Sequence, residues 1–258
     1  MRGYSAFLAK EFTEMVKTRK VLIILAVFIL FGIMSPILAK MMPDLLSSMT
    51  ESMAEEGVVI SIAEPTVADS YMQLFKNFTQ MGLIVVLLVF SNILSGELSK
   101  GTLTALLAKG LRRDSVILAK YTAAVFWWTV GLAAGTGIAY IYTILLFGAH
   151  DAHHLVFSVF CLWLFVCAII TLILLSSVIV KGSVGGLAIS VGSIILMFII
   201  NIFPQAVKYN PIALASSNAN IALGRVEYSQ VLPAVWVTAA LSIVSIFFTI
   251  VIFRKKAI

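Results

Sequence analysis

The sequence is poor in charge and in the polar motifs of soluble enzymes. Only 12% of its 258 residues are charged and 61% are hydrophobic, whereas a soluble domain is closer to a quarter charged and half apolar. It contains neither a HExxH zinc motif nor a GxSxG nucleophile elbow. Gly96 and Gly101 have the glycine spacing of a P-loop, but Thr102 stands where that motif requires lysine. The composition therefore predicts a membrane protein that does not hydrolyse ATP by itself.

Cysteine and histidine are also scarce. Cys161 and Cys167 fall in one apolar run, about 9 Å apart along a helix, which is too far for them to bridge, so we interpret them as packing residues. The histidines are confined to one short segment, where His150 and His153 have a spacing that could place both on one metal ion, with His154 beside them. Since a zinc site needs three or four ligands, a solvated turn is favoured, and we expect no metal and no cofactor in this chain.

Six hydrophobic runs are long enough to cross a bilayer, whose core of about 30 Å needs about 20 apolar helical residues. We therefore predict an all-α integral membrane protein, with residues 1–258 forming a single transmembrane domain. No charged residue lies in the centre of any run, which disfavours a proton-coupled pump and an intramembrane enzyme. The predicted spans are residues 21–39, 78–97, 121–147, 155–180, 183–203 and 232–253.

The basic residues indicate the orientation of these spans. Fourteen of the 18 Lys and Arg residues fall on one side of the predicted membrane. Cytoplasmic segments carry such an excess, so both termini are expected to be cytoplasmic in a multi-pass plasma-membrane protein. The basic net charge of +6 is thus a topology signal, and we expect contact with membrane lipid and no binding of nucleic acid. The four exceptions are Lys40, Lys76, Lys208 and Arg225.

The segments outside the spans have distinct patterns. Residues 1–20 predict an amphipathic helix lying in the inner interface with its apolar face toward lipid. Residues 40–77 are acidic and follow Pro36, which is expected to kink or end the first span, so they are interpreted as an external segment. Residues 205–230 are predicted to form short helices at the outer leaflet.

Glycines recur at close-packing spacings within the spans. Gly131 and Gly135 form a GxxxG pair in the third span, and Gly182 and Gly186 repeat the spacing at the start of the fifth. Small residues allow helices to approach closely in lipid. Packing within the chain is the favoured interpretation, and a dimer seam is the alternative.

The only long polar and basic passage between two apolar runs is Ser95 to Lys120, SGELSKGTLTALLAKGLRRDSVILAK. It contains Glu97 at the inner end of the second span, then Gly101-Thr102, a leucine-rich stretch with Leu103 and Leu106, and a basic turn at Arg112-Arg113. This order, together with the layout of the whole chain, resembles the permease subunits of type-2 ABC exporters. The resemblance implies a cytoplasmic coupling helix within residues 98–115, between spans two and three.

The resemblance also implies partners and residue roles. A separate ABC ATP-binding subunit, in two copies, would hold ATP and magnesium and dock on the connector. Since six spans are half a translocation path in this family, a second permease is implied, either a homodimer partner or a related chain. One alternative is a non-transporting membrane scaffold or immunity protein. The residues implied in coupling are Glu97, Gly101, Thr102, Leu103, Leu106, Arg112 and Arg113.

Overall fold

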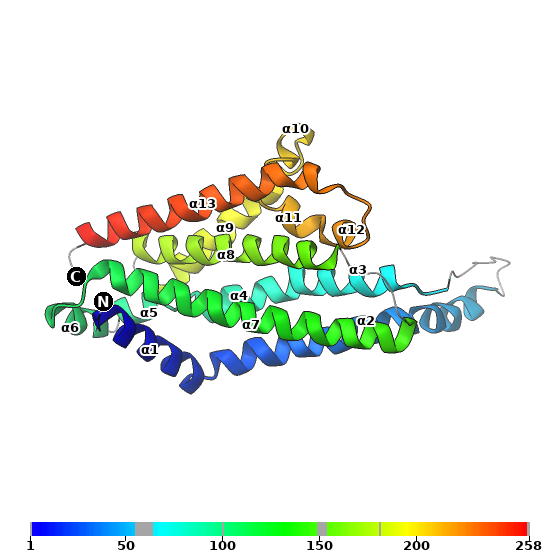
Figure 1. The fold of residues 1–258 in the computed structure, drawn as a ribbon, viewed down its shortest axis with the longest axis horizontal. Coiled ribbons are helices and arrows are strands. Elements are labelled where there is room, and N and C mark those ends of the chain that lie inside the picture. Colours follow the sequence, from blue (N-terminus) through cyan, green and yellow to red (C-terminus); the bar gives the residue numbers. More distant parts are fainter. Residues whose placement is uncertain (1, 55–63, 100, 149–153, 181, 257–258) are drawn as a thin grey trace.

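The computed structural model describes residues 2–54, 64–99, 101–148, 154–180 and 182–256, and in these residues the regular structure is helical (Figure 1). Along the chain the helices are α1 (Arg2–Lys17), α2 (Lys20–Ala54), α3 (Val67–Asn77), the π-helix η1 (Phe78–Gly82), α4 (Leu83–Phe90), α5 (Ser95–Ser99), α6 (Thr102–Ala108), α7 (Arg113–Phe147), α8 (Leu155–Ile179), α9 (Ser183–Ile200), α10 (Pro204–Val207), α11 (Ala213–Ser216), α12 (Asn218–Ala222) and α13 (Tyr228–Lys255).

Six helical segments of the described residues are long and apolar enough to cross a membrane, which confirms the predicted fold class. Helix α8 lies at the centre of the bundle, and α7, α9 and α13 pack against it. It is accordingly the most buried of the six. The spans are Lys20–Leu45, Val67–Ser99, Arg113–Phe147, Leu155–Ile179, Ser183–Ile200 and Tyr228–Lys255.

Two 35-residue helices, α2 and α7, run side by side. At about 1.5 Å per residue each is about 52 Å long, well beyond the bilayer core. Helix α2 passes through Pro36 and Pro43 without ending, so the segment expected to be external from residue 40 is helical as far as Ala54. Proline is tolerated inside membrane helices because neighbouring helices and local adjustments compensate for the lost hydrogen bond.

The second span also begins earlier than the sequence suggested. Helix α3 starts at Val67, and the side chain of Asp69 accepts a hydrogen bond from the backbone of Thr66 just before it. Tyr71, Leu74 and Phe75 of α3 are buried in the bundle, so this amphipathic stretch extends the span rather than lying outside it. The span then changes to a π-helix at η1 and opens into a turn at residues 91–94 before α5.

Helix α1 crosses the end of the bundle obliquely (Figure 1). Phe7 and Met15 are buried, and α1 packs mainly on α7. The apolar face expected to rest on lipid is therefore largely covered by protein, because α7 supplies a partner; Phe12, for example, packs on Phe126 and Trp127. Both chain ends and α6 lie at this same end of the molecule (Figure 1), which we call the connector end.

The short helices before α13 lie against the bundle at its other end. Leu214 in α11 and Ile221 in α12 are fully buried, and both helices pack on α8. The segment expected at the outer leaflet is thus partly a component of the helical core. His154 lies nearby and its Nδ1 is 2.6 Å from the hydroxyl oxygen of Tyr228; His150 and His153 are outside the described residues.

Candidate functional site

The connector between the second and third spans holds the short helix α6 between two glycine turns, and the short helix α5 precedes the first turn. Gly101 has φ +69° and Gly110 has φ +89°. Nothing lies within 4 Å of a Cβ added at either position, so these glycines are required by backbone conformation rather than by space. Side chains other than glycine adopt such φ values at a cost of about 1–2 kcal/mol. The two turns therefore fix the path by which the chain leaves the second span and enters the third.

Glu97 is held at the base of the connector by two lysines. Its Oε2 lies 2.9 Å from Nζ of Lys120 on α7, and its Oε1 accepts a hydrogen bond from Lys10 on α1. The Glu97 side chain is 12% exposed. Three segments far apart in sequence thus meet at one carboxylate.

Glu11 and Glu14 of α1 complete this charge cluster. Lys120 donates a 2.9 Å hydrogen bond to Glu11, and their side chains are only 1% and 3% exposed. Lys10 also contacts Glu14 at 2.5 Å. We use the name charge cluster for Lys10, Glu11, Glu14, Glu97 and Lys120.

Pairing is what makes these charges tolerable. A charge removed from water is costly unless it is paired and hydrogen-bonded, and removal of one partner costs about 3–5 kcal/mol. Although burial lowers the pKa of Lys10, hydrogen bonds to Glu14 and Glu97 raise it by more, so this pKa lies above its ordinary value. The three carboxylates approach one another closely, but each is ion-paired with Lys10 or Lys120, and these two ammonium groups offset two of the three negative charges.

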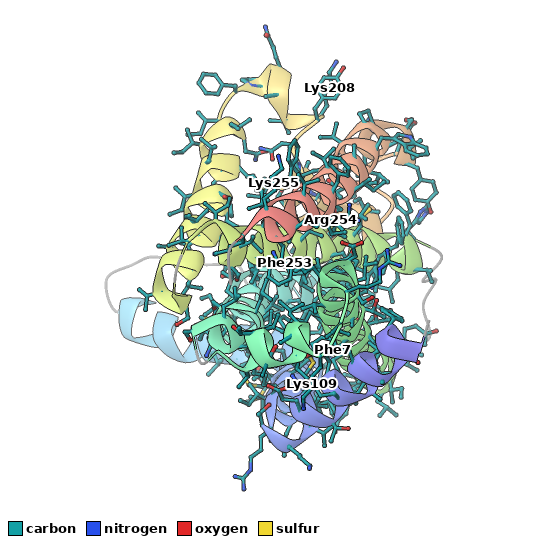
Figure 2. All side chains as sticks on the ribbon, turned by 90° about the vertical axis from the view of Figure 1, so that its left-hand side faces the viewer. Phe7, Lys109, Lys208, Phe253, Arg254 and Lys255 are labelled. Atoms are coloured by element: carbon teal, nitrogen blue, oxygen red, sulfur yellow. The ribbon has the colours of Figure 1, made fainter. Side chains whose placement is uncertain are left out.

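Helix α6 presents two different faces. Leu103 is fully buried and anchors the helix, while Leu106 is half-buried. The opposite face is exposed and uncharged along the helix, with Lys109 just after its last residue. Figure 2 shows Lys109 on the side of the molecule that faces the viewer, at the connector end. The exposed positions of this face are Thr102, Thr104, Ala105 and Ala108, with the exposed Lys109 at its edge.

The two arginines of the basic turn point to different surroundings. The Arg112 side chain is 81% exposed. Arg113 instead donates hydrogen bonds to backbone carbonyls at the end of α13. An open groove of about 830 Å³ lies beside this turn, with Tyr4 of α1 and Leu111 among its lining residues. The basic turn therefore offers one exposed cation, Arg112, and one structural cation, Arg113.

The predicted packing glycines fall into two groups. A Cβ on Gly131 would lie 2.5 Å from Ile24, and one on Gly135 would lie 2.6 Å from the carbonyl oxygen of Phe28, so both glycines allow α7 to approach α2. A Cβ on Gly186 would lie 3.6 Å from Ser177 of α8, which is ordinary van der Waals contact. Gly182 has φ +100° and open space around it, so it serves the turn between α8 and α9.

The sequence did not single out Glu11 or Lys120 as site residues. Glu11 lies within the segment expected to form an amphipathic helix, and Lys120 immediately precedes the predicted third span. The available signal was the position of Lys120 directly before the apolar run that begins at Tyr121, whereas Glu11 stands among polar neighbours. The structure brings Glu97 to them and leaves Thr102 and Arg112 exposed at some distance along the connector.

The fold and this site define a polytopic α-helical membrane protein with a braced connector at the end that carries both termini. Residues 6–255 match the family described as "ABC-2 family transporter protein", and the chain belongs to that family. It is also 22% identical, over 224 residues that cover 86% of each protein, to the "Uncharacterized transmembrane protein YxlG" of Bacillus subtilis (strain 168).

Proposed function

We propose that this chain is the membrane-spanning permease of an ABC exporter in the plasma membrane, with both termini in the cytoplasm. A separate ATP-binding subunit, present in two copies, binds ATP and magnesium and docks on the exposed face of α6, which we call the docking face. A second permease, identical or related, completes the translocation path. Membership of the ABC-2 family supports this role.

The observation that carries the proposal is the bracing of the connector. Helix α6 exposes small side chains on one face, while Glu97 at its base is ion-paired to both α1 and α7. A force applied to α6 is therefore passed to the third span and to the N-terminal helix instead of being absorbed by a loose loop. Residues Gly101, Thr102, Leu103 and Leu106 set the path and the anchoring of α6 in this proposal.

The charge and shape of the docking face indicate which kind of partner surface would fit it. The docking face is small and uncharged along α6, with Lys109 and Arg112 at its edge. We expect a shallow apolar groove on the ATP-binding subunit with acidic residues along its rim. Complementary charge of this kind steers association and fixes register more than it adds affinity.

The experiment is co-purification in detergent of the chain with a co-expressed P-loop ATPase from the same organism. Ala105→Trp, which places a bulky group on the docking face, and Lys109→Glu are expected to reduce the recovered ATPase by at least tenfold. Lys208→Glu is the matched control, since Lys208 is also an exposed lysine but lies far from Lys109 (Figure 2).

A stoichiometric ATPase that is lost only with the docking-face variants supports the permease. Recovery of a clean oligomer without ATPase, from cells that express one, would favour a membrane scaffold or immunity protein. Equal loss with Lys208→Glu would show that the variants act through expression or insertion rather than docking.

A further inference from the structure

The last turn of α13 is fastened to the first turn of α7. Nη1 of Arg113 donates hydrogen bonds to the carbonyl oxygens of Phe253, Arg254 and Lys256 at 2.8, 2.9 and 2.6 Å. The Arg113 guanidinium also lies 5.9 Å from the centre of the Phe253 ring, which is fully buried. The last carbonyls of a helix have no partner within it and usually face water; here the two N–H groups of one Arg113 nitrogen are shared between two of them and the carbonyl of Lys256, the residue after the helix.

A second interaction joins the same two helices. Arg254 Nε and Nη2 donate to the two carboxylate oxygens of Asp114 at 2.7 and 2.5 Å. This two-pronged geometry is the more specific form of the arginine–carboxylate pair. Asp114 lies in the first turn of α7 and Arg254 in the last turn of α13, so each charge also complements its own helix dipole.

The third contact reaches the end of α8. Nζ of Lys256 donates a 2.6 Å hydrogen bond to the carbonyl oxygen of Val178, close to the last residue of that helix. We call Arg113, Asp114, Phe253, Arg254 and Lys256 the C-terminal clamp. In Figure 1, α8 runs between α13 and α7, and the clamp joins these two helices directly at the connector end.

The position of the clamp relates it to the connector. Arg113 and Asp114 follow directly after the turn that ends α6, so any displacement of α6 acts on the same residues that hold α13. An exposed ion pair alone contributes little to stability, and the Arg254 side chain is 60% exposed. The three carbonyl bonds, the ion pair and the buried ring act together, however, and they define one relative position of the two helices.

We propose that the C-terminal clamp makes α7 and α13 move as one body at the connector end, so that a displacement of the connector is passed to the sixth span as well as the third. Asp114, Arg113 and Arg254 are positioning residues in this scheme. The transmission to the sixth span rests on the proposed function, whereas the rigid junction itself does not.

The test measures the distance between α7 and α13 by electron paramagnetic resonance in lipid nanodiscs. Nitroxide labels are placed at Leu118→Cys and Lys255→Cys, both of which are exposed, in a chain whose native cysteines are replaced by alanine. The unaltered clamp is expected to give one narrow distance distribution. Arg254→Gln and Asp114→Asn are expected to broaden it at least twofold, and their combination is expected to broaden it no further.

Two further variants separate geometry from charge. Arg254→Lys keeps the charge but loses the two-pronged contact, and it is expected to give an intermediate width. Lys17→Gln removes an exposed positive charge from α1 and is expected to leave the distribution unchanged. Equal widths of the distance distribution in the parent, Arg254→Gln and Asp114→Asn would overturn the proposed role of the clamp. This test holds even if the more disruptive Arg113→Gln fails to fold.

The second arm adds the ATP-binding subunit in nucleotide-free and nucleotide-trapped states. The proposal expects the interspin distance to stay constant between these states with an intact clamp and to change with Asp114→Asn. A shift of several ångströms in the parent would contradict the proposal while leaving the permease function intact. Failure of any P-loop subunit to bind would count against the proposed function alone, because the first arm uses the chain without a partner.

Discussion

Replacing Lys120 by methionine tests the charge cluster most severely. Lys120 pairs with Glu11 and Glu97, and the side chains of Lys120 and Glu11 are 1% and 3% exposed. The substitution keeps the length of the side chain but leaves two largely buried carboxylates with Lys10 as their nearest cation. Removing one partner of a buried pair costs about 3–5 kcal/mol. Since Lys10 continues to neutralise part of the charge, we expect about 3 kcal/mol.

The assay is the thermal midpoint of the purified chain in detergent, followed by size-exclusion chromatography after heating. Glu11→Gln combined with Lys120→Met also removes one of the two carboxylates that Lys120 pairs with. The double variant should therefore lose less stability than the sum of the losses of the two single variants, by about 1–2 kcal/mol. Lys109→Met, at an exposed position, should stay within about 0.5 kcal/mol of the parent. A Lys120→Met chain as stable as the parent, or strictly additive effects, would refute the reasoning.

Three further predictions follow from the site and its surroundings. Glu97→Ala or Gly101→Val should separate ATP hydrolysis from transport while membrane insertion is unchanged. Glu97→Ala loses the ion pairs that hold the connector, and Gly101→Val places a β-branched residue at φ +69°. Normal transport by both variants in vesicles would contradict the coupling role. Gly135→Ala should destabilise the chain by about 1–3 kcal/mol through overpacking, because the added Cβ would lie 2.6 Å from the carbonyl oxygen of Phe28. Gly137→Ala is the control, since its added Cβ would have nothing within 4 Å. Similar thermal midpoints for the two variants would contradict close α2–α7 packing. Since the pKa of Lys10 is raised, the contribution of Lys10 to stability is complete below the ordinary lysine pKa and is lost as pH rises through the higher folded value. The difference in thermal midpoint between the parent and Lys10→Met should therefore be constant from pH 6 to 9 and shrink only above about pH 10.5. A difference that shrinks between pH 6 and 9 would argue against the pairing.

The sequence predicts the fold class well because apolar run length is a strong signal. The run around Leu162 and Ile173, for example, forms the buried central helix α8. Boundaries were less predictable, since amphipathic turns at Tyr71 and Leu74 have too many polar neighbours to read as membrane spans. Pro36 and Pro43 also suggest an early end to the first span, but α2 continues through both because its packing along α7 outweighs the usual effect of proline.

Some residues of the candidate site could likewise be predicted from the sequence, and others could not. Glu97 and Gly101 could be identified from local pattern, because a charge at the end of a span and a glycine between two helices are local features. The pairing of Glu97 with Lys120 could not, since it depends on how the connector folds back beside α7. Arg113 resembled a second exposed cation next to Arg112, and only the position of α13 shows that it caps another helix.

Site-specific photo-crosslinking tests the central claim, that α6 is the docking site of an ATP-binding subunit, most directly. A photoreactive amino acid is placed at Ala105 on the docking face, or at Lys208 as the exposed control, in cells that express the complete transporter. We expect the Ala105 position, and not Lys208, to yield a crosslinked product that contains a P-loop ATPase. No such product from Ala105, or equal amounts from both positions, would contradict the account.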